Sequence, residues 1–431
     1  YYKITKVKTR ISTLVIAAAL AALVCVEAAA FDGYAPPEAA DSGEVYSPFV
    51  GRNYPDEVLF GDLHFHTEIS FDAGLVGTRL TMHDAFRVAR GEKIISNTGQ
   101  PVQLIRPLDF LAITDHAEML GLATAMRTSD PRLLADEWGA KIHTLFNSGQ
   151  EGRMAAFADI IKIGTVQGRD PLEGLDLDGD IWLDIIKTVD AYNEPGRFTS
   201  LAGFEWTFTP KGDNLHRVIL FRDGADKTGM TRPFTFFDGS DPELLWEYLA
   251  GYEASTGGQV IAVPHNANLS NGLMFAPRNS DGTPINARYA KLRARNEVAT
   301  EIIQTKGQSD THPALSPNDE FAGFEKQYDH LIGTNPPVLG RVNYSYVREA
   351  LINGVGYEEY IGVNPFKFGI VAGADAHTGF SDNEEFNYTG VHGNLDKTAK
   401  IRLSGAGTTA GESAVKFGTP GATGVWAPEN T

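Results

Sequence analysis

The chain is organised around the stretch Phe60-Gly-Asp-Leu-His-Phe-His-Thr-Glu-Ile-Ser-Phe-Asp72. The apolar run at 58–60 predicts the end of a buried strand. Side chains two residues apart on a strand face the same side, so His64 and His66 should leave this strand next to each other. Two adjacent imidazoles suit a metal ion, but histidines on a strand are also common as ordinary polar residues. Ligands supplied by other segments therefore decide whether this is a metal site.

The composition permits a sizeable core and argues against polyanionic partners. Hydrophobic residues make up 42% of the 431 residues, which is ordinary for a globular protein and allows one large domain or two smaller ones. The formal net charge is −18, with 55 acidic residues against 37 basic ones. We therefore expect neither nucleic acid nor an anionic membrane surface as a partner. The sequence does not indicate the oligomeric state.

The first 30 residues have the organisation of a secretory signal peptide. Basic residues at 3, 6, 8 and 10 precede an apolar run at 11–26, and Ala28-Ala-Ala30 offers a cleavage site. We expect a periplasmic or secreted bacterial protein, with no stable membrane span after cleavage. The apolar run is short for a span, so an uncleaved anchor or a lipoprotein attached through Cys25 is less favoured. Cleavage removes Cys25, the only cysteine, and leaves histidine and carboxylate as the metal ligands.

The rest of the chain is predicted to form one domain after a short leader. Residues 31–55 are rich in Ala, Pro, Asp and Ser, which is typical of a flexible leader. Residues 56–431 form the predicted domain. Its last residues, 425–431, resemble the cap of a helix that does not follow, so we expect a chain truncated at its C-terminus.

Apolar runs alternate with helical patterns along this domain. The predicted strands are 107–114, 198–207, 215–221, 259–265, 298–304 and 368–377, and the helices between them include 82–90, 241–255 and 345–353. Residues 119–195 contain only helical patterns, at 132–146, 153–166 and 180–192, and are predicted to form a helical surface insertion. The alternation predicts an α/β fold with a largely parallel sheet covered by helices. After residue 377 the pattern is typical of loops.

Histidines and carboxylates lie at the ends of these apolar runs. The candidate ligands are His64, His66, Asp72, His116, Glu205, His216, His265, Asp375 and His377. Active sites of barrels and doubly wound sheets form at the carboxyl ends of the strands. We therefore expect the nine side chains to meet there.

Nine ligands are too many for one ion and suit two or three. Imidazole with carboxylate fits Zn, Mn or Fe without discriminating among them. A carboxylate can bridge two ions, and Glu205 is the natural candidate for this role. Clustered divalent ions lower the pKa of bound water and stabilise charge on the oxygens of an ester. The set therefore predicts hydrolysis of esters, above all phosphoesters.

Six phrases carry a resemblance to a known family. They are Gly61-Asp-Leu-His-Phe-His-Thr67, Ile113-Thr-Asp-His-Ala-Glu118, Gly203-Phe-Glu-Trp-Thr207, Asp213-Asn-Leu-His-Arg217, Val263-Pro-His-Asn266 and Gly373-Ala-Asp-Ala-His-Thr378. The order of their ligands is similar to that of the polymerase and histidinol phosphatase (PHP) superfamily. Their wording is closer still to a family of uncharacterised, often exported PHP-like proteins, catalogued as domain of unknown function 3604 (DUF3604). The phrases span about 57–380, most of the mature chain.

The resemblance implies a distorted (β/α) barrel of the PHP type with a trinuclear metal site. It implies a first metal on His64, His66, Glu205 and Asp375, a second on Glu205, His216 and His265, and a third on Asp72, His116 and His377. Superfamily members often have histidine where this chain has Asp72, which leans the third position towards Mn, Fe or a weakly held ion. Family members usually continue beyond the end of this chain.

A few further residues are weaker candidates. Asp115 would orient an imidazole or a bound water, or simply cap a strand. Arg217 and Lys306 would bind an anionic substrate, although each is also plausible as a surface charge. Asn266 and Asn268 would contact substrate or stabilise turns. The remaining histidines are expected at the surface or in the core, and they are His83, His143, His312, His330 and His392.

These inferences together predict an exported metal-dependent hydrolase acting on a small anionic ester, either a phosphoester or a phosphonate or sulfate ester. Two alternatives remain open. One is an amidohydrolase-like enzyme that cleaves C–N or lactone bonds. The other is a non-catalytic metal-binding protein of the cell envelope. The natural substrate does not follow from the sequence.

Overall fold

A computed structural model of the chain describes residues 55, 57–327, 338–381, 383–393, 398, 417–418 and 420–431. The predicted signal peptide, all but residue 55 of the predicted leader, and His330 lie outside the described residues. Pro55–Thr431 forms a single compact unit. No helix among the described residues is both long enough and apolar enough to cross a bilayer.

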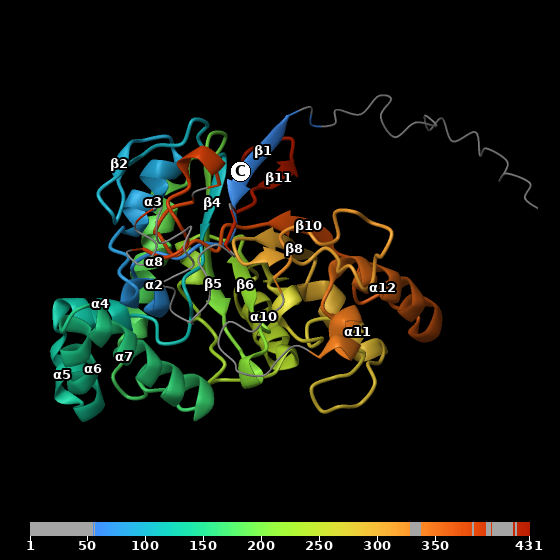
Figure 1. Cartoon of the computed structure of the whole chain (residues 1–431), viewed down its shortest axis with the longest axis horizontal. Helices are drawn as coiled ribbons and strands as arrows, with labels where there is room; N and C mark the ends of the chain where they lie inside the picture. Colours follow the sequence, from blue (N-terminus) through green and yellow to red (C-terminus); the bar gives the residue numbers. More distant parts are fainter. Residues whose placement is uncertain are drawn as a thin grey trace, which may run out of the picture. The chain divides into compact units, whose positions relative to one another are not determined.

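The fold is mixed α/β, built on a six-stranded sheet that curls into a half-barrel (Figure 1). The strand order is β11 (Thr423–Trp426), β1 (Val58–Asp62), β4 (Phe110–Ile113), β5 (Thr199–Trp206), β6 (Arg217–Phe221), β7 (Val260–Pro264). A second sheet has the order β10 (Gly369–Ala372), β8 (Ala299–Gln304), β9 (Gly307–Gln308). A small hairpin joins β2 (Ile94–Ile95) and β3 (Pro101–Val102).

The expectation of a largely parallel sheet is wrong. Within the six-stranded sheet, β1 pairs in parallel with β4, and β4 with β5. However, β6 is antiparallel to both β5 and β7, and β11 is antiparallel to β1. The connection from β5 to β6 is short enough for a hairpin, whereas a parallel pair needs a long crossover. Residues 425–431 were predicted as the cap of a helix and the residues before them as loop, but residues 423–426 form strand β11. The prediction failed because this stretch contains no extended apolar run.

Main-chain hydrogen bonds join the two sheets where their strands end. The amide of Asp375, after β10, donates to the carbonyl of His64 at 2.6 Å, and the amide of His66 donates to the carbonyl of Ala376 at 2.9 Å. On the other side, Thr300 Oγ1 of β8 donates to the carbonyl of Pro264 of β7 at 3.1 Å. The segments that follow β1, β7 and β10 are thereby held at one end of the molecule.

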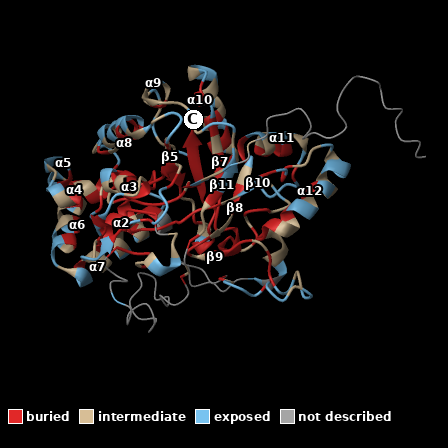
Figure 2. Ribbon diagram, turned by 90° about the horizontal axis from the view of Figure 1, so that it is seen from above, coloured by how far each residue is buried: buried red, intermediate tan, exposed pale blue. Residues whose placement is uncertain are grey.

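Alternation along the strands separates two apolar layers. Even-numbered residues of β6 such as Val218 and Leu220 pack inside the curl against Ala112 and Val263. Odd-numbered residues such as Ile219 and Phe221 pack outward against helices. The helices of this outer layer include α3 (Met82–Ala89), α8 (Asp178–Tyr192), α10 (Pro242–Thr256) and α11 (Ala287–Asn296). Figure 2 shows the strands as a buried centre with more exposed helices around them.

The predicted helix starts are confirmed by their caps. Thr81 forms a capping box with Asp84 at the start of α3. Asp241 accepts a hydrogen bond from the amide of Glu243 at the start of α10, with Pro242 in the first turn. The predicted helix at 345–353 runs further than expected, as α12 (Val347–Ile361), and ends at Gly362 in a left-handed conformation.

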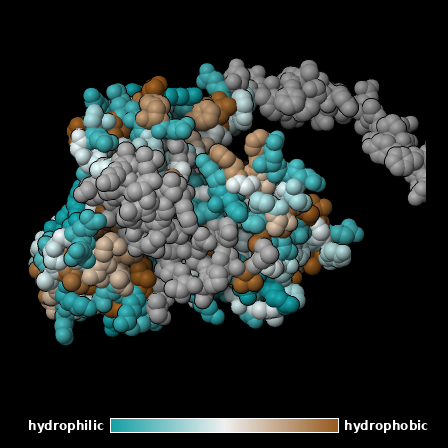
Figure 3. Space-filling view, viewed as in Figure 1, coloured by the Kyte–Doolittle hydropathy of each residue, from teal (hydrophilic) through white to brown (hydrophobic). Residues whose placement is uncertain are grey.

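Residues 119–195 are helical as predicted, but they do not form one insertion. The helices α4 (Leu122–Thr128), α5 (Pro131–Ala135), α6 (Glu137–Asn147) and α7 (Gln150–Ile161) surround an apolar cluster of their own. They form a lobe beside the sheet in Figure 1, and its visible face in Figure 3 mixes hydrophilic with hydrophobic residues. By contrast, α8 packs into the main core through Trp182, Ile185, Ile186 and Val189. The expectation that this last helix is a surface element is therefore wrong.

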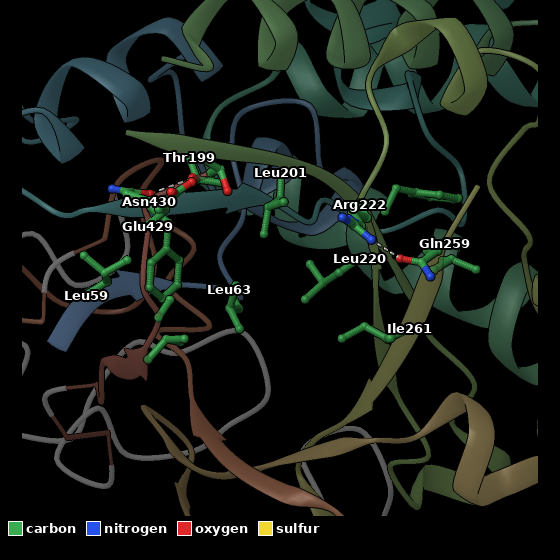
Figure 4. A pocket seen from close by; sticks show the side chains of 16 residues that line it. Leu59, Leu63, Thr199, Leu201, Leu220, Arg222, Gln259, Ile261, Glu429 and Asn430 are labelled. Carbon is green, nitrogen blue, oxygen red and sulfur yellow. Dashed lines mark hydrogen bonds between the residues drawn. The ribbon is translucent and has the colours of Figure 1, made fainter. Parts of the chain in front are cut away.

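An open apolar cavity of about 380 Å³ lies at the amino ends of the parallel strands. Leu59, Leu201, Leu220 and Ile261 line it, and Arg222 pairs with Gln259 at its edge (Figure 4). None of the predicted metal ligands lines this cavity. The ligands follow the opposite, carboxyl ends of the same parallel strands.

The placement of α8 can be tested by truncating two neighbouring side chains. Trp182 is 1% exposed and packs against Phe204 and Phe221, whereas Leu183 is 38% exposed. We expect Trp182→Ala to lower the free energy of unfolding by about 3–5 kcal/mol, and Leu183→Ala by no more than about 0.5 kcal/mol. Denaturant titration measures both. Equal effects would show that α8 does not belong to the main core.

Candidate metal centre

All nine predicted ligands meet at the carboxyl ends of the parallel strands, and we call these residues the ligand cluster. Glu205 lies within 3.5 Å of ring nitrogens of His64, His66, His116, His216 and His265. Asp375 lies within 3.7 Å of His64, His66 and His377, and Asp72 lies within 3.0 Å of His116 and His377. All of these side chains are buried except that of Asp72, which is 15% exposed.

The spacing of ligand atoms divides most of the cluster into three groups, each of which could hold a metal ion. They are His64 with His66 and Asp375, His64 with Glu205 and His265, and His66 with Asp72, His116 and His377. His216 adjoins the second group through Nδ1, 2.8 Å from Oε1 of Glu205. This partition differs from the three predicted metal positions in two ways. His64 and His66 each belong to two groups, whereas Glu205, predicted to be shared by two metals, belongs to one group only, and His216 to none.

Strand parity and direction explain how the middle of the cluster forms. Glu205 and His265 share the inward parity of their strands, and His116 and Glu205 form a parallel bridge beyond the paired part of β4 and β5. His216 stands just before β6, whereas Glu205 lies near the end of β5 and His265 follows β7. Because β6 is antiparallel to β5, its beginning lies at the end of the sheet where β5 finishes.

Asp72 reaches the cluster from the short helix α2 (Phe71–Leu75). Its Oδ1 accepts from Ser70 Oγ at 2.8 Å and from the amide of Ala73 at 2.6 Å. Its Oδ2 therefore faces His116 Nε2 at 3.0 Å and His377 Nε2 at 2.7 Å. One carboxylate oxygen anchors the helix start, and the other faces the imidazoles.

Most imidazoles present one nitrogen to the cluster and hold the other on a polar partner. His66 Nδ1 contacts Ser70 Oγ at 3.2 Å, and His377 Nδ1 contacts the carbonyl of Asp375 at 2.9 Å. Nδ1 of His116 contacts Thr207 Oγ1, and Nε2 of His216 contacts Thr209 Oγ1 at 2.8 Å. Partners of this kind fix ring orientation and tautomer in metal sites.

The cluster perturbs the acidity of its own members. Burial alone would raise the pKa of Glu205, but the charges of His116 and His265 hold this pKa well below its usual value. Burial opposes protonation of His116, yet the carboxylates of Asp72 and Glu205 outweigh it and raise its pKa to about 10. For His216, burial dominates and lowers the pKa to about 4. The carboxylates are thus ionised in the acceptor-only form that a cation needs.

The four residues predicted to act in catalysis have different positions. Glu205 lies in the cluster, and Lys306 pairs through Nζ with Asp375 Oδ2. Asp115 accepts from the amide of Thr67 at 2.6 Å and from its hydroxyl at 2.8 Å, so it holds the chain just after His66. These hydrogen bonds fit a role for Asp115 in orienting the segment that carries His66.

Arg217 does not point into the cluster. It is 1% exposed, its Nε donates to Glu297 Oε1 at 2.9 Å, and a terminal nitrogen donates to the carbonyl of Leu215 at 2.7 Å. Adjacent residues on a strand face opposite sides, so the inward position of His216 sends Arg217 outward to the helices. The prediction that Arg217 binds substrate is therefore not supported, and strand alternation alone would have excluded it.

The two asparagines after β7, predicted to contact substrate or to stabilise turns, have different surroundings. Asn268 donates to the carbonyls of Lys306 and Gln327 at 3.2 and 2.6 Å, which is a turn-stabilising role. Asn266 has a left-handed backbone conformation (φ 52°), and its buried Nδ2 has no hydrogen-bond partner among the described residues.

Three further residues at the site were not among the predicted site residues. Glu301 Oε2 lies 2.8 Å from His64 Nδ1, and Gln304 Nε2 donates to Asp375 Oδ2 at 2.5 Å. Both belong to β8, which was predicted as a strand but not as part of the site. The carboxylate of Glu301 within an otherwise apolar strand was the signal that could have indicated a role at the site. His392, expected outside the site, has its ring 5.4 Å from that of His377.

The donor set fits divalent transition metals better than alkaline-earth ions. Imidazole nitrogens outnumber carboxylate oxygens, and buried imidazole with carboxylate is typical of Zn, Mn and Fe sites. The buried, ionised carboxylates also need positive charge nearby, which a cation supplies directly. The groups could therefore hold metal ions, although their geometry does not identify the metal.

A family model described as "Protein of unknown function (DUF3604)" matches residues 53–431. The matched range contains the whole ligand cluster and all of the described strands. Comparison with curated proteins gives no match.

Loading the cluster with metal should expel protons. His116, with a pKa of about 10, carries a proton at neutral pH in the metal-free protein, and coordination requires a neutral ring. We expect Zn²⁺ binding at pH 7.5 to release at least about one proton, and the apparent affinity to rise with pH. Calorimetry in buffers of different ionisation enthalpy measures the release. The control is His143→Asn, at a partly exposed position of α6 outside the ligand cluster, which should release as many protons as wild type. Binding without proton release would contradict the prediction.

Proposed function

The chain belongs to the DUF3604 family of proteins of unknown function, and we propose that it is an exported metal-dependent hydrolase. Its substrate is a small anionic ester, either a phosphoester or a phosphonate or sulfate ester. The observation that carries the proposal is the position of Glu205, whose two oxygens face different imidazoles within one buried cluster.

Each oxygen of Glu205 serves a separate side of the cluster. Oε1 lies 2.8 Å from His216 Nδ1 and 3.0 Å from His265 Nε2. Oε2 lies 3.3 Å from His66 Nε2 and 3.4 Å from His64 Nε2. A carboxylate placed in this way suits a bridge between two cations, and paired cations are the usual device for hydrolysing phosphoesters.

We infer a di- or trinuclear centre of Zn, Mn or Fe ions in a barrel of the PHP type. The three ligand groups and their location at the carboxyl ends of parallel strands support this inference. So does the order of the ligands along the chain, which resembles that of the superfamily. When bound, such ions lower the pKa of a coordinated water and neutralise charge on the oxygens of the ester.

The charge balance of the cluster favours an anionic substrate. Asp72, Glu205 and Asp375 contribute three negative charges, whereas three divalent ions would bring six positive ones. Glu301 beside His64 and Lys306 beside Asp375 offset each other. The loaded centre would therefore retain positive charge, which attracts phosphate or sulfate esters more than neutral amides or lactones. This surplus positive charge would attract the anionic substrate, a role that was predicted for Arg217.

Metal analysis and a substrate panel test the class of reaction. We expect the purified protein to contain two to three transition-metal ions per chain and to hydrolyse nitrophenyl phosphate, phosphonate or sulfate esters at least about tenfold faster than the acetate, because only charged esters gain from the surplus positive charge. Elemental analysis and nitrophenolate release measure these quantities. Preferential cleavage of amides or lactones would favour an amidohydrolase-like enzyme. A metal-loaded but inert protein would favour a binding role in the envelope.

A conservative change at the centre tests the bridge itself. We expect Glu205→Gln to lower kcat at least about 100-fold with little change in the thermal unfolding temperature of the metal-free protein. The amide keeps the shape but loses a negative oxygen, and even outer partners of metal ligands cost about 10–100-fold when removed. Steady-state kinetics and thermal denaturation provide the measurements.

Glu349→Gln provides the matched control for this change. Glu349 lies on α12 near Thr311, outside the ligand cluster. This variant should retain full activity. Wild-type turnover by Glu205→Gln would reject the bridging role.

A further inference from the structure

The strand β8 and the turn after it supply no member of the ligand cluster, yet three of their side chains contact cluster ligands. Glu301 contacts His64, and Gln304 and Lys306 contact Asp375. We call these three residues the support set. Both of the ligands that they contact belong to the group of His64, His66 and Asp375.

The two oxygens of Asp375 have different surroundings. Oδ2 accepts from Gln304 Nε2 at 2.5 Å and pairs with Lys306 Nζ. Oδ1 faces His66 Nε2 at 3.2 Å and His64 Nε2 at 3.6 Å. Gln304 is itself held, because its Oε1 accepts from the amide of Lys306 at 2.6 Å. Only Oδ1 is therefore available to a cation.

His64 is oriented by the same strand. Its Nδ1 lies 2.8 Å from Glu301 Oε2, so its Nε2 faces Glu205 and Asp375. Gly373 permits this approach, since a Cβ there would lie 2.4 Å from Glu301 Oε2 and 2.7 Å from His64 Cβ. Any side chain at position 373, in the segment that carries Asp375, would therefore interfere with the contact between Glu301 and His64.

The other two carboxylates of the cluster are held by different groups. Asp72 is anchored by Ser70 and the amide of Ala73, which belong to its own helix start. Glu205 has both oxygens directed at imidazoles. The two ligands that the support set contacts share one group, that of His64, His66 and Asp375, although His64 also belongs to the group of Glu205 and His265.

We propose that β8 is a positioning strand for one metal position. Glu301 fixes His64 to coordinate through Nε2, and Gln304 with Lys306 restricts Asp375 to a single coordinating oxygen. This inference rests on the metal centre of the proposed function and deepens it, because it assigns Glu301, Gln304 and Lys306 to the positioning of ligands at one of the metal positions. It also gives Lys306 a role other than substrate binding.

Selective loss of one metal is the expected result of disrupting the support set. Gln304→Leu, Lys306→Met and Glu301→Leu should each weaken binding at one position about 10–100-fold. Elemental analysis after dialysis against a graded chelator should then show one metal ion per chain fewer than in wild type, with the others retained. Glu301→Gln keeps an acceptor for His64 Nδ1 and should recover most of the loss seen in Glu301→Leu.

A spectroscopic readout separates positioning from general stability. In the Co²⁺-loaded protein, an Asp375 freed to bind through both oxygens would raise the coordination number of one ion and weaken its visible absorption bands. We expect this change in Gln304→Leu and Lys306→Met. The matched controls are Gln308→Leu on β9 and Lys227→Met, which pairs with Asp223, because neither residue contacts the cluster. Both controls should keep the wild-type metal content and spectrum.

The outcomes that overturn this inference are distinct from those that overturn the function. Variants of the support set with wild-type metal content, affinity and Co²⁺ spectrum would overturn the positioning role and leave the hydrolase proposal standing. An equal loss of all metal positions in folded variants would also overturn it. A wild-type protein that binds no transition metal would overturn the proposed function and this inference together.

Discussion

The carboxylate of Glu205 is 1% exposed and shared between imidazoles on two sides. A buried carboxylate is costly unless positive charge or hydrogen-bond donors surround it. Here the compensation comes from rings on four different segments, so the energy of this one group depends on the convergence of distant parts of the chain. The curl of the sheet, the reversal of β6 and the junction of β1 with the segment after β10 all bring those rings within reach.

The same requirement explains why the second sheet lies where it does. The segment after β10 carries Asp375 and His377, and β8 beside it carries the groups that orient Asp375 and His64. Ligands and their outer partners therefore come from two adjacent, parallel-paired strands. The register of this pairing shifts between Val371 and Ala372, just before the segment that carries Asp375. Groups placed on or directly beside strands are still held more precisely than groups on loops, which suits a site where angles matter.

Much of the site was predictable from the sequence, and the failures have identifiable physical causes. Ligands such as His265 and Asp375 follow apolar runs, and burial makes those runs visible. The antiparallel direction of β6 was not predictable from its pattern. Its residues are buried at every position, and a continuous apolar run is typical of parallel strands covered on both faces. β11 was missed because it is short and has few apolar residues. Glu301 and Gln304 were overlooked because a polar residue inside a strand acquires its meaning only from a partner far away in sequence.

The helical lobe bears on the chemistry through α2. Phe71 and Leu75 of this helix belong to the apolar cluster of the lobe, while Asp72 between them faces His116 and His377. The ring of Phe71 lies 5.2 Å from that of His116 and stacks on Phe157 of α7 at 6.4 Å. A change in the packing of the lobe would therefore move α2 and with it the one carboxylate of the cluster that is partly exposed.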